Sequence, residues 1–466
     1  MSFSRARASP LATSLIAHRP RIQSRCPGCS QPFLTNAGLS LRISGQHVSN
    51  LRNQSSVAAA VQAAKTFFNN ENAPSPPMGI DPLKSVAKEL SFLAGNMKAL
   101  LGSGHPMLDT MAKYYTQSEG KYVRPMLVLL MSRATAVMPK SARHTYDTSK
   151  EGVNTTFSPA SVLADNNPTS QLTSSVDDTN SDPSVLPSQR RLAEITELIH
   201  TASLLHDDVI DNSEARRSMP SANIAFGNKM AVLAGDFLLG RASVALARLR
   251  DPEVTELLAT VIANLIEGEF MQLRNTALDE KNPQWSEETV TYYLQKTYLK
   301  SASLISKSCR AAALLGEQTP EVVEAAYQYG KNLGMAFQLV DDMLDYTIDE
   351  AELGKPAGAD LELGLATAPL LFAWKDNAEL GTLVGRKFAE EGDVSKVRPI
   401  GTLIHDQLLT VCKARELVLT SDGLAQTRAL AQDYVDKAKS AIAAFPESEA
   451  KQGLLEMCTK VMTRRK

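Results

Sequence analysis

Three aspartates interrupt an apolar helical segment near the middle of the chain. The segment 198–217 reads LIHTASLLHDDVIDNSEARR, and Asp207, Asp208 and Asp211 occupy positions i, i+1 and i+4. At about 100° per residue, this spacing places the three carboxylates on one arc of a helix. Crowded carboxylates beside apolar side chains are costly unless a cation binds them. Oxygen ligands without a His or Cys cluster favour a hard cation such as Mg²⁺, and the alternative is a solvated acidic helix end.

The same spacing recurs in a second apolar segment. The sequence GMAFQLVDDMLDY carries Asp341, Asp342 and Asp345, with Gln338 on the same helical face. Two such helices facing each other would form a cage of carboxylates for several divalent ions around a diphosphate. With these two DDxxD motifs the chain resembles the trans-polyprenyl diphosphate synthase family, from about residue 80 onward. Within that family it is most similar to mitochondrial long-chain (hexaprenyl to decaprenyl) synthases of ubiquinone biosynthesis.

Composition predicts an all-α fold. Aromatic residues make up only 6% of the chain, Ala, Leu, Glu and Lys are abundant, and alternating β tracts are lacking. No uninterrupted apolar run reaches the roughly 18 residues of a membrane span, so we expect a soluble protein or one that associates peripherally with a membrane. The resemblance implies one large helical bundle of the isoprenoid synthase type over residues 83–466, with a central active-site cavity.

The N-terminal segment has the composition of a mitochondrial transit peptide. Residues 1–70 contain no Asp or Glu but eight Lys and Arg residues among many Ser and Ala. The alternative is a disordered basic tail that binds nucleic acid. Removal of these eight charges would change the formal net charge from −2 to −10, which argues against a nucleic-acid partner. We expect the mature protein in the mitochondrial matrix, and a location at the inner membrane is a further possibility that the sequence leaves open. A Pro-rich linker is predicted at residues 71–82.

Two segments break the helical pattern of the expected synthase domain. Residues 139–188 are rich in Ser, Thr, Asn, Asp and Pro, which predicts a disordered insertion. Residues 397–413 separate two stretches that are nearly continuous in the family. This second segment is either a surface insertion or a retained intron in the gene sequence.

Cationic residues flank the aspartate motifs. In EGKYVRP, Lys121 and Arg124 precede an apolar helix, where backbone N–H groups add partial positive charge and favour phosphate binding. A solvated charge pair is the alternative. The resemblance implies that both side chains bind isopentenyl diphosphate, although Glu119 and Tyr122 stand where the family has Gly and Arg. It further implies isopentenyl diphosphate ligands at His200 and Arg217, allylic diphosphate ligands at Arg216, Lys296 and Thr297, and further phosphate-binding residues at Gln338 and Lys355.

The expected chemistry is prenyl transfer from an allylic diphosphate to isopentenyl diphosphate. The family uses two to three Mg²⁺ ions per active site, and electrostatic stabilisation of the leaving diphosphate is the main catalytic contribution. Positioning of the isopentenyl alkene supplies the rest. The predicted catalytic residues are the six motif aspartates and Lys296. The predicted metal ligands are Asp207, Asp208, Asp211, Asp341 and Asp342.

Two small residues predict a long product. Ala202 and Ser203 lie five and four positions before Asp207, one turn deeper along the helix. Family members with short products carry bulky aromatic residues there, so small side chains leave the channel open for a growing chain. We therefore expect Ala202→Phe to shorten the product.

Other functions remain open from sequence alone. A class I terpene cyclase is also helical and Mg²⁺-dependent, but it usually carries an Asn/Ser/Glu motif at the second metal site. The chain could also be a non-catalytic or obligate-partner subunit of a heteromeric synthase, or a synthase of shorter chains. We expect a homodimer or a heteromer with a related subunit.

Overall fold

A computed structural model describes residues 81–102, 106–117, 122–141, 182–216, 219–276, 285–347, 359–362, 364–385 and 413–464. The predicted presequence at 1–70, nearly all of the linker at 71–82, most of the insertion at 139–188, and residues 397–412 lie outside this described part. The described residues all belong to one compact unit.

The predicted all-α fold is confirmed. Within the described residues, the only strands are β1 (Ala215–Arg216) and β2 (Met219–Pro220), which pair as a short antiparallel hairpin. The N-terminal helices are α2 (Pro82–Ser85), α3 (Ala87–Leu100), α4 (Pro106–Gln117), α5 (Val123–Ala136), α8 (Pro187–Ile210), α9 (Ala222–Phe226) and α10 (Asn228–Arg248). The middle of the chain forms α11 (Pro252–Thr276), α12 (Glu287–Thr297), the π-helix η1 (Tyr298–Ala302), α13 (Ser303–Leu315) and α14 (Pro320–Thr347). The C-terminal helices are α16 (Ala359–Glu362), α17 (Ala368–Asp376), α18 (Glu379–Gly385), α19 (Lys413–Leu419), α20 (Gly423–Ala441) and α21 (Glu449–Thr463).

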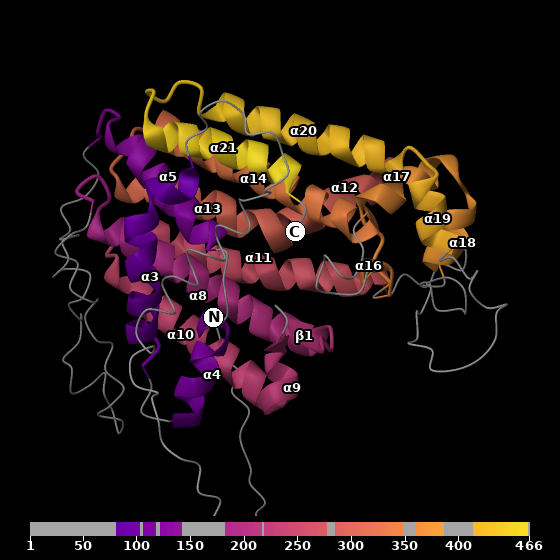
Figure 1. Cartoon of the computed structure of the whole chain (residues 1–466), viewed down its shortest axis with the longest axis horizontal. Coiled ribbons are helices and arrows are strands. Elements are labelled where there is room, and N and C mark those ends of the chain that lie inside the picture. The colour runs from indigo at the N-terminus through magenta and orange to yellow at the C-terminus, as the bar shows by residue number, and fades with distance from the viewer. Residues whose placement is uncertain are drawn as a thin grey trace, which may run out of the picture. The chain divides into compact units, whose positions relative to one another are not determined.

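The two helices that carry the aspartate motifs are long and largely buried. Each begins at a proline, which suits a first helical turn because the missing N–H has no intrahelical partner there. α8 packs against α10, α5 and α13, whereas α14 packs against both α13 and α20 (Figure 1). α13 therefore contacts both motif helices and fixes their relative position.

A glycine allows α14 to lie close to the wall of the site. A Cβ atom on Gly334 would stand 2.7 Å from the Cα atom of Ala302, which is shorter than real contacts. One turn further along α14, the Oγ atom of Ser301 donates a hydrogen bond of 2.7 Å to Oε1 of Gln338. The close packing thus joins the second aspartate helix to η1.

α10 is the one described helix that is long and apolar enough to cross a membrane by length and composition. Its most apolar window has a mean hydropathy of 1.5, and 44% of that window is buried inside the protein. Asp236 and Arg241 interrupt the apolar run, which explains why no uninterrupted span is visible in the sequence. α10 packs against α8, α4, α9 and α11, as a helix of a bundle does.

Candidate functional site

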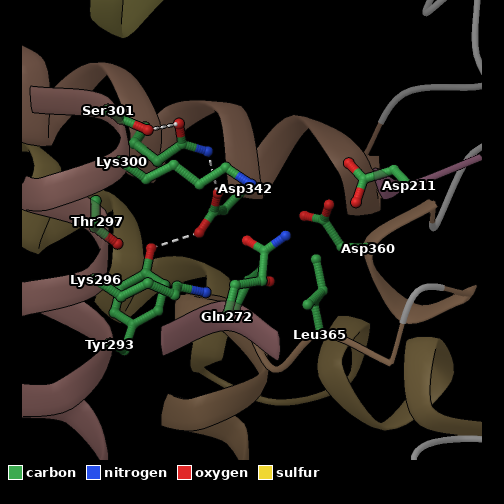
Figure 2. Close-up of a pocket in the computed structure, with 12 residues that line it drawn as sticks. Asp211, Gln272, Tyr293, Lys296, Thr297, Lys300, Ser301, Asp342, Asp360 and Leu365 are labelled. Carbon is green, nitrogen blue, oxygen red and sulfur yellow. Dashed lines mark hydrogen bonds between the residues drawn. The ribbon is translucent and has the colours of Figure 1, made fainter. Parts of the chain in front are cut away.

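A cavity of about 160 Å³ lies where both aspartate motifs meet the α12–η1 segment. Five of the predicted site residues line it: Asp211, Lys296, Thr297, Gln338 and Asp342. Figure 2 shows lysines from α12 and η1 together with carboxylates from both motifs around this space. The predicted central cavity therefore contains the expected combination of anionic and cationic side chains.

The three aspartates of the first motif have different surroundings. Asp208 is fully buried and accepts hydrogen bonds from the Arg216 guanidinium, with Nη2 at 2.6 Å and Nε at 2.9 Å from Oδ1. The hydroxyl group of Tyr115 donates a further hydrogen bond to the same carboxylate. Asp207 and Asp211 remain partly exposed. In this structure the middle aspartate thus binds protein donors, and its two neighbours face the site.

A partly buried ion pair interacts electrostatically with Asp207 and Asp211. Nζ of Lys300 lies 2.6 Å from a carboxylate oxygen of Glu269. Burial raises the pKa of Asp207 to about 6, and the effects of Lys300, which lowers it, and Glu269, which raises it, are smaller. Burial would lower the pKa of the Lys300 ammonium, but Asp207 and Glu269 outweigh this effect and raise it. The first motif therefore holds a concentration of negative charge that a cation would stabilise.

The second motif, like the first, contains both buried and accessible carboxylates. Asp342 is 3% exposed and accepts hydrogen bonds from the amide of Gln338 at 2.8 Å and from the hydroxyl group of Tyr293. Asp345 is 1% exposed and accepts a hydrogen bond of 3.2 Å from the backbone N–H of Asp360. Burial raises the pKa of Asp342 to about 6. Two of the three carboxylates are therefore held within the protein.

Asp341 is the accessible carboxylate of the second motif. Its side chain is 47% exposed and pairs with Arg464 at 2.6 Å. The Arg464 guanidinium also stacks on the ring of Phe337, 3.9 Å from its centroid. This contact brings the residue that follows α21, at the C-terminal end of the described chain, to the second motif.

The π-helical turn places two lysines at the cavity wall. Lys296 is 6% exposed, and burial lowers its pKa although Asp342 and Asp360 act in the opposite direction. Lys300, one helical turn later, faces the first motif. π-helical turns are rare and frequently occur at functional sites. The structure thus adds Lys300 and Ser301 to the predicted Lys296–Thr297 pair.

Two predicted isopentenyl diphosphate ligands are close together. Nη1 of Arg124 on α5 lies 2.8 Å from Nε2 of His200 on α8. Their sequence separation is 76 residues, so the fold rather than local spacing joins them. Lys121, Arg217 and Lys355 lie outside the described residues, and their roles stay predictions.

The two residues predicted to set product length have unequal exposure. Ala202 is completely buried. Ser203 is half-buried, and its Oγ atom donates a hydrogen bond of 2.9 Å to the backbone carbonyl of His200. Neither residue lines the cavity between the two motifs, and their role in product length stays a prediction.

The motif carboxylates fit a hard cation without forming a complete metal cage. Among the described residues, no group of three or more His, Cys, Asp or Glu side chains is arranged to hold a metal ion. Asp207, Asp211 and Asp341 are the motif carboxylates that reach solvent, and they offer only oxygen ligands. Such a set suits Mg²⁺, which binds through few carboxylates together with phosphate oxygens and water.

The pKa of Asp207 leads to a prediction about pH. Because its folded-state pKa lies above the unfolded value, this carboxyl group destabilises the metal-free protein as pH rises from about 4 to about 6. Cation binding needs the ionised form, so affinity for Mg²⁺ with inorganic diphosphate should fall as pH drops below about 6. Thermal unfolding at a series of pH values, with and without both ions, measures this. Asp207→Asn should weaken this pH dependence, and the remainder should come from Asp342 and Asp211, whose pKa burial also raises. An unchanged pH profile in that variant would contradict the assignment.

Several site residues carried weak sequence signals or none. Lys300 lies four residues after Lys296, but the π-helical turn at Tyr298–Ala302 sets its direction, and helical periodicity does not predict such a turn. Asp360 gave no signal. Glu269 lies one helical turn before Gln272, but nothing in the sequence pairs it with Lys300. Arg464 lies 123 residues from Asp341, so no local pattern predicts their contact.

A helical bundle with two aspartate motifs and clustered lysines at one cavity defines a class of cation-dependent enzymes that act on diphosphates. Residues 105–400 match the family model described as polyprenyl synthetase. The chain belongs to this family and is a trans-polyprenyl diphosphate synthase, a prenyltransferase. The family match favours this activity over the terpene cyclase alternative.

Relatives cover most of the chain. It is 64% identical to the probable mitochondrial hexaprenyl pyrophosphate synthase of Neurospora crassa, over 89% of this chain and 90% of the relative. It is 45% identical to the decaprenyl-diphosphate synthase subunit 1 of Schizosaccharomyces pombe, over 82% of this chain and 90% of that protein. The crystal structure of a Caulobacter crescentus polyprenyl synthase, complexed with calcium and isoprenyl diphosphate, superposes with a TM-score of 0.64 at 28% identity. That match covers 84% of this chain and all of the other.

Proposed function

We propose that this enzyme condenses isopentenyl diphosphate repeatedly onto an allylic diphosphate primer to make hexaprenyl diphosphate for the ubiquinone side chain. The observation that carries the proposal is the cavity in which Asp211 and Asp342 face Lys296 and Lys300. The 64% identity to a probable hexaprenyl pyrophosphate synthase supports the six-unit product. Small side chains at Ala202 and Ser203 support a long product.

In this proposal the accessible motif carboxylates hold Mg²⁺. Asp207, Asp211 and Asp341 are the first candidates, and Asp208 and Asp345 stabilise the motifs from inside the protein. Asp342 lines the cavity, where it accepts hydrogen bonds from Gln338 and Tyr293. When bound, two to three Mg²⁺ ions neutralise the allylic diphosphate as its C–O bond breaks. A relative binds calcium and isoprenyl diphosphate, which supports a divalent ion here.

Protein cations would bind and orient the two substrates. Lys296, Lys300 and Arg216 stand around the motifs, where they can stabilise the leaving diphosphate. Arg124 and His200 lie beside each other and can hold isopentenyl diphosphate, so that its alkene attacks the allylic carbon. The departing diphosphate would then accept the proton that the new product loses.

A mitochondrial site of action follows from two observations. Residues 1–70 have the composition of a transit peptide, and the Neurospora crassa relative is described as mitochondrial. We place the mature enzyme in the matrix, with its long apolar product drawing it to the inner membrane.

An apolar face on α10 and α11 supports an oligomer. Ile266, Phe270 and Leu273 lie on one face of α11 and are 54%, 69% and 46% exposed, and Leu233 on neighbouring α10 is 57% exposed. Large apolar side chains clustered in this way usually mark an interface. We propose that a second copy of the chain covers this face.

Phe270→Asp should therefore convert a dimer into a monomer, because a buried carboxylate without a partner is costly at an apolar interface. Light scattering after size-exclusion chromatography measures the mass. Glu267→Lys on an adjacent, more polar part of α11 is the matched control and should remain dimeric. A wild-type monomer, or a dimeric Phe270→Asp variant, would contradict the assignment.

The direct test of the function is elongation by the purified protein alone. Incubation with Mg²⁺, labelled isopentenyl diphosphate and an allylic primer should yield polyprenyl diphosphates, and a metal chelator should stop the reaction. No elongation by the protein alone, with activity restored by a related subunit, would favour the obligate-partner alternative that the Schizosaccharomyces pombe relative's description as subunit 1 suggests.

A further inference from the structure

Each aspartate motif receives a hydrogen bond from the second tyrosine of a Tyr-Tyr pair. On α4, the hydroxyl group of Tyr114 donates to the backbone carbonyl of Pro220 at 2.9 Å, whereas Tyr115 donates to Asp208. On α12, Tyr292 donates to the backbone carbonyl of Met271 at 3.0 Å, whereas Tyr293 donates to Asp342. Asp208 and Asp342 are the middle aspartates of their motifs. The same arrangement thus occurs at two sites that share no helix.

The first contact is enclosed on all sides. Tyr115 is 5% exposed and Asp208 is fully buried. The Tyr115 hydroxyl also accepts a hydrogen bond of 2.8 Å from the backbone N–H of Ala222 at the start of α9. With Arg216 on the other side of the carboxylate, both oxygens of Asp208 have donors from outside α8. Rotation of the Asp208 side chain toward the cavity would break several hydrogen bonds at once.

The second contact likewise joins a buried tyrosine to a carboxylate that has donors on both oxygens. Tyr293 is 1% exposed, and its hydroxyl donates to Oδ2 of Asp342 (Figure 2). The Gln338 amide donates to Oδ1 of the same carboxylate. In both contacts the tyrosine hydroxyl is the donor and the carboxylate the acceptor. A buried carboxylate without these donors would be costly.

Each tyrosine also lies close to predicted diphosphate ligands. Tyr293 is on α12, three residues before Lys296, and Tyr115 shares the carboxylate of Asp208 with Arg216. The hydrogen bonds therefore connect each motif helix to the surroundings of a cation that would act beside it. A shift of about 1 Å between such groups can cost about a hundredfold in rate.

We propose that Tyr115 and Tyr293 are positioning residues that fix the middle aspartate of each motif. With Asp208 and Asp342 fixed, α8 and α14 present the outer carboxylates Asp207, Asp211 and Asp341 to the cation and diphosphate. This inference rests on the proposed function and adds two residues to its site. The tyrosines act through the aspartates and touch no substrate in this account.

The test compares four conservative variants. Tyr115→Phe and Tyr293→Phe remove one hydroxyl each and keep the ring. Tyr114→Phe and Tyr292→Phe remove the neighbouring hydroxyl, which donates to a backbone carbonyl rather than to a motif aspartate, and serve as matched controls. We expect the first two to lower kcat by about 10- to 100-fold and to raise KM for the allylic diphosphate, which the motif-bound ions hold. KM for isopentenyl diphosphate, assigned to Arg124 and His200, should change less than about threefold. The controls should stay within about threefold of the wild type.

A binding measurement separates this inference from the proposed function. Mg²⁺ with inorganic diphosphate should stabilise the wild type and both control variants against thermal unfolding, whether or not the protein elongates prenyl chains. In Tyr115→Phe and Tyr293→Phe, the apparent affinity for this pair of ions should fall about fivefold or more. Wild-type protein that binds the ions but does not elongate would contradict the function alone.

A double-variant experiment distinguishes positioning from general structural damage. If Tyr293 acts through Asp342, Tyr293→Phe added to Asp342→Asn should lower kcat little further than Asp342→Asn alone. The same should hold for Tyr115→Phe added to Asp208→Asn. Losses that multiply in the double variants, or single variants with near-wild-type kcat and ion affinity, would overturn the inference.

Discussion

Asp211→Asn should reduce kcat by about a thousandfold and leave the fold intact. Asp211 lines the cavity and is one of the accessible motif carboxylates. Burial raises its pKa, which indicates a charge that the protein alone does not stabilise well and that a divalent ion would. Loss of this charge removes a metal ligand at the point where the leaving diphosphate gains charge, and single electrostatic contributions of this kind are worth about 10²–10³ in rate.

Glu214→Gln is the matched control for this variant. Glu214 is an exposed acid three residues beyond Asp211 and does not line the cavity. The same change of charge should leave kcat within about twofold, since exposed charges contribute little. Steady-state elongation rates, with thermal unfolding to check the fold, measure both variants. An Asp211→Asn enzyme that keeps more than a tenth of wild-type kcat would remove Asp211 from the metal site.

Ala202→Phe should shift the product to chains about two or more isoprene units shorter. Ala202 lies on α8 five residues before Asp207 and is completely buried, so an aromatic ring there occupies space beneath the first motif. Overpacking of a buried position costs about 1–3 kcal/mol, and the variant should unfold at a lower temperature while it still elongates the primer.

Leu204→Phe provides the control for added bulk. Leu204 lies two residues further along α8, about 200° around the helix, and is half-buried. Its product distribution should match that of the wild type. Chromatographic sizing of dephosphorylated products compares the three proteins. An unchanged product distribution in Ala202→Phe would exclude this position from control of chain length.

The sequence predicted those parts of the site that depend on local spacing. Asp207, Asp208 and Asp211 share a helical face because of their i, i+1, i+4 pattern, and the structure places them in the last turn of α8 and at its C-cap. The all-α fold followed from composition and helical periodicity. Both features depend on residues that are close in the chain.

The spacing of the aspartates did not predict which of them are buried and which are accessible. Tyr115 lies 93 residues from Asp208, and Tyr293 lies 49 residues from Asp342. Tertiary packing brings them together, because α9 and α10 contact both α4 and α8, and α12 packs on α14. Helical periodicity alone predicts the same environment for all three carboxylates of a motif. Tertiary donors hold the middle carboxylate of each motif within the protein. Asp207, Asp211 and Asp341 stay accessible, whereas Asp345 is buried as well.

The cationic side of the site shows the same limit. The sequence identified Lys296, but Lys300 carries the closer electrostatic contact with Asp207 and Asp211. The π-helical turn at Tyr298–Ala302 sets this register, and periodicity at 3.6 residues per turn does not predict such a turn. Lys121, Arg217 and Lys355 lie outside the described residues, and substitutions at these positions would test their expected roles.

The mass of the product made by the purified wild-type enzyme is the most direct test of this account. With Mg²⁺, an allylic diphosphate primer and excess isopentenyl diphosphate, mass spectrometry of the dephosphorylated product should show hexaprenol as the main species. A main product of four isoprene units or fewer would contradict a long-chain synthase with an open channel below Asp207.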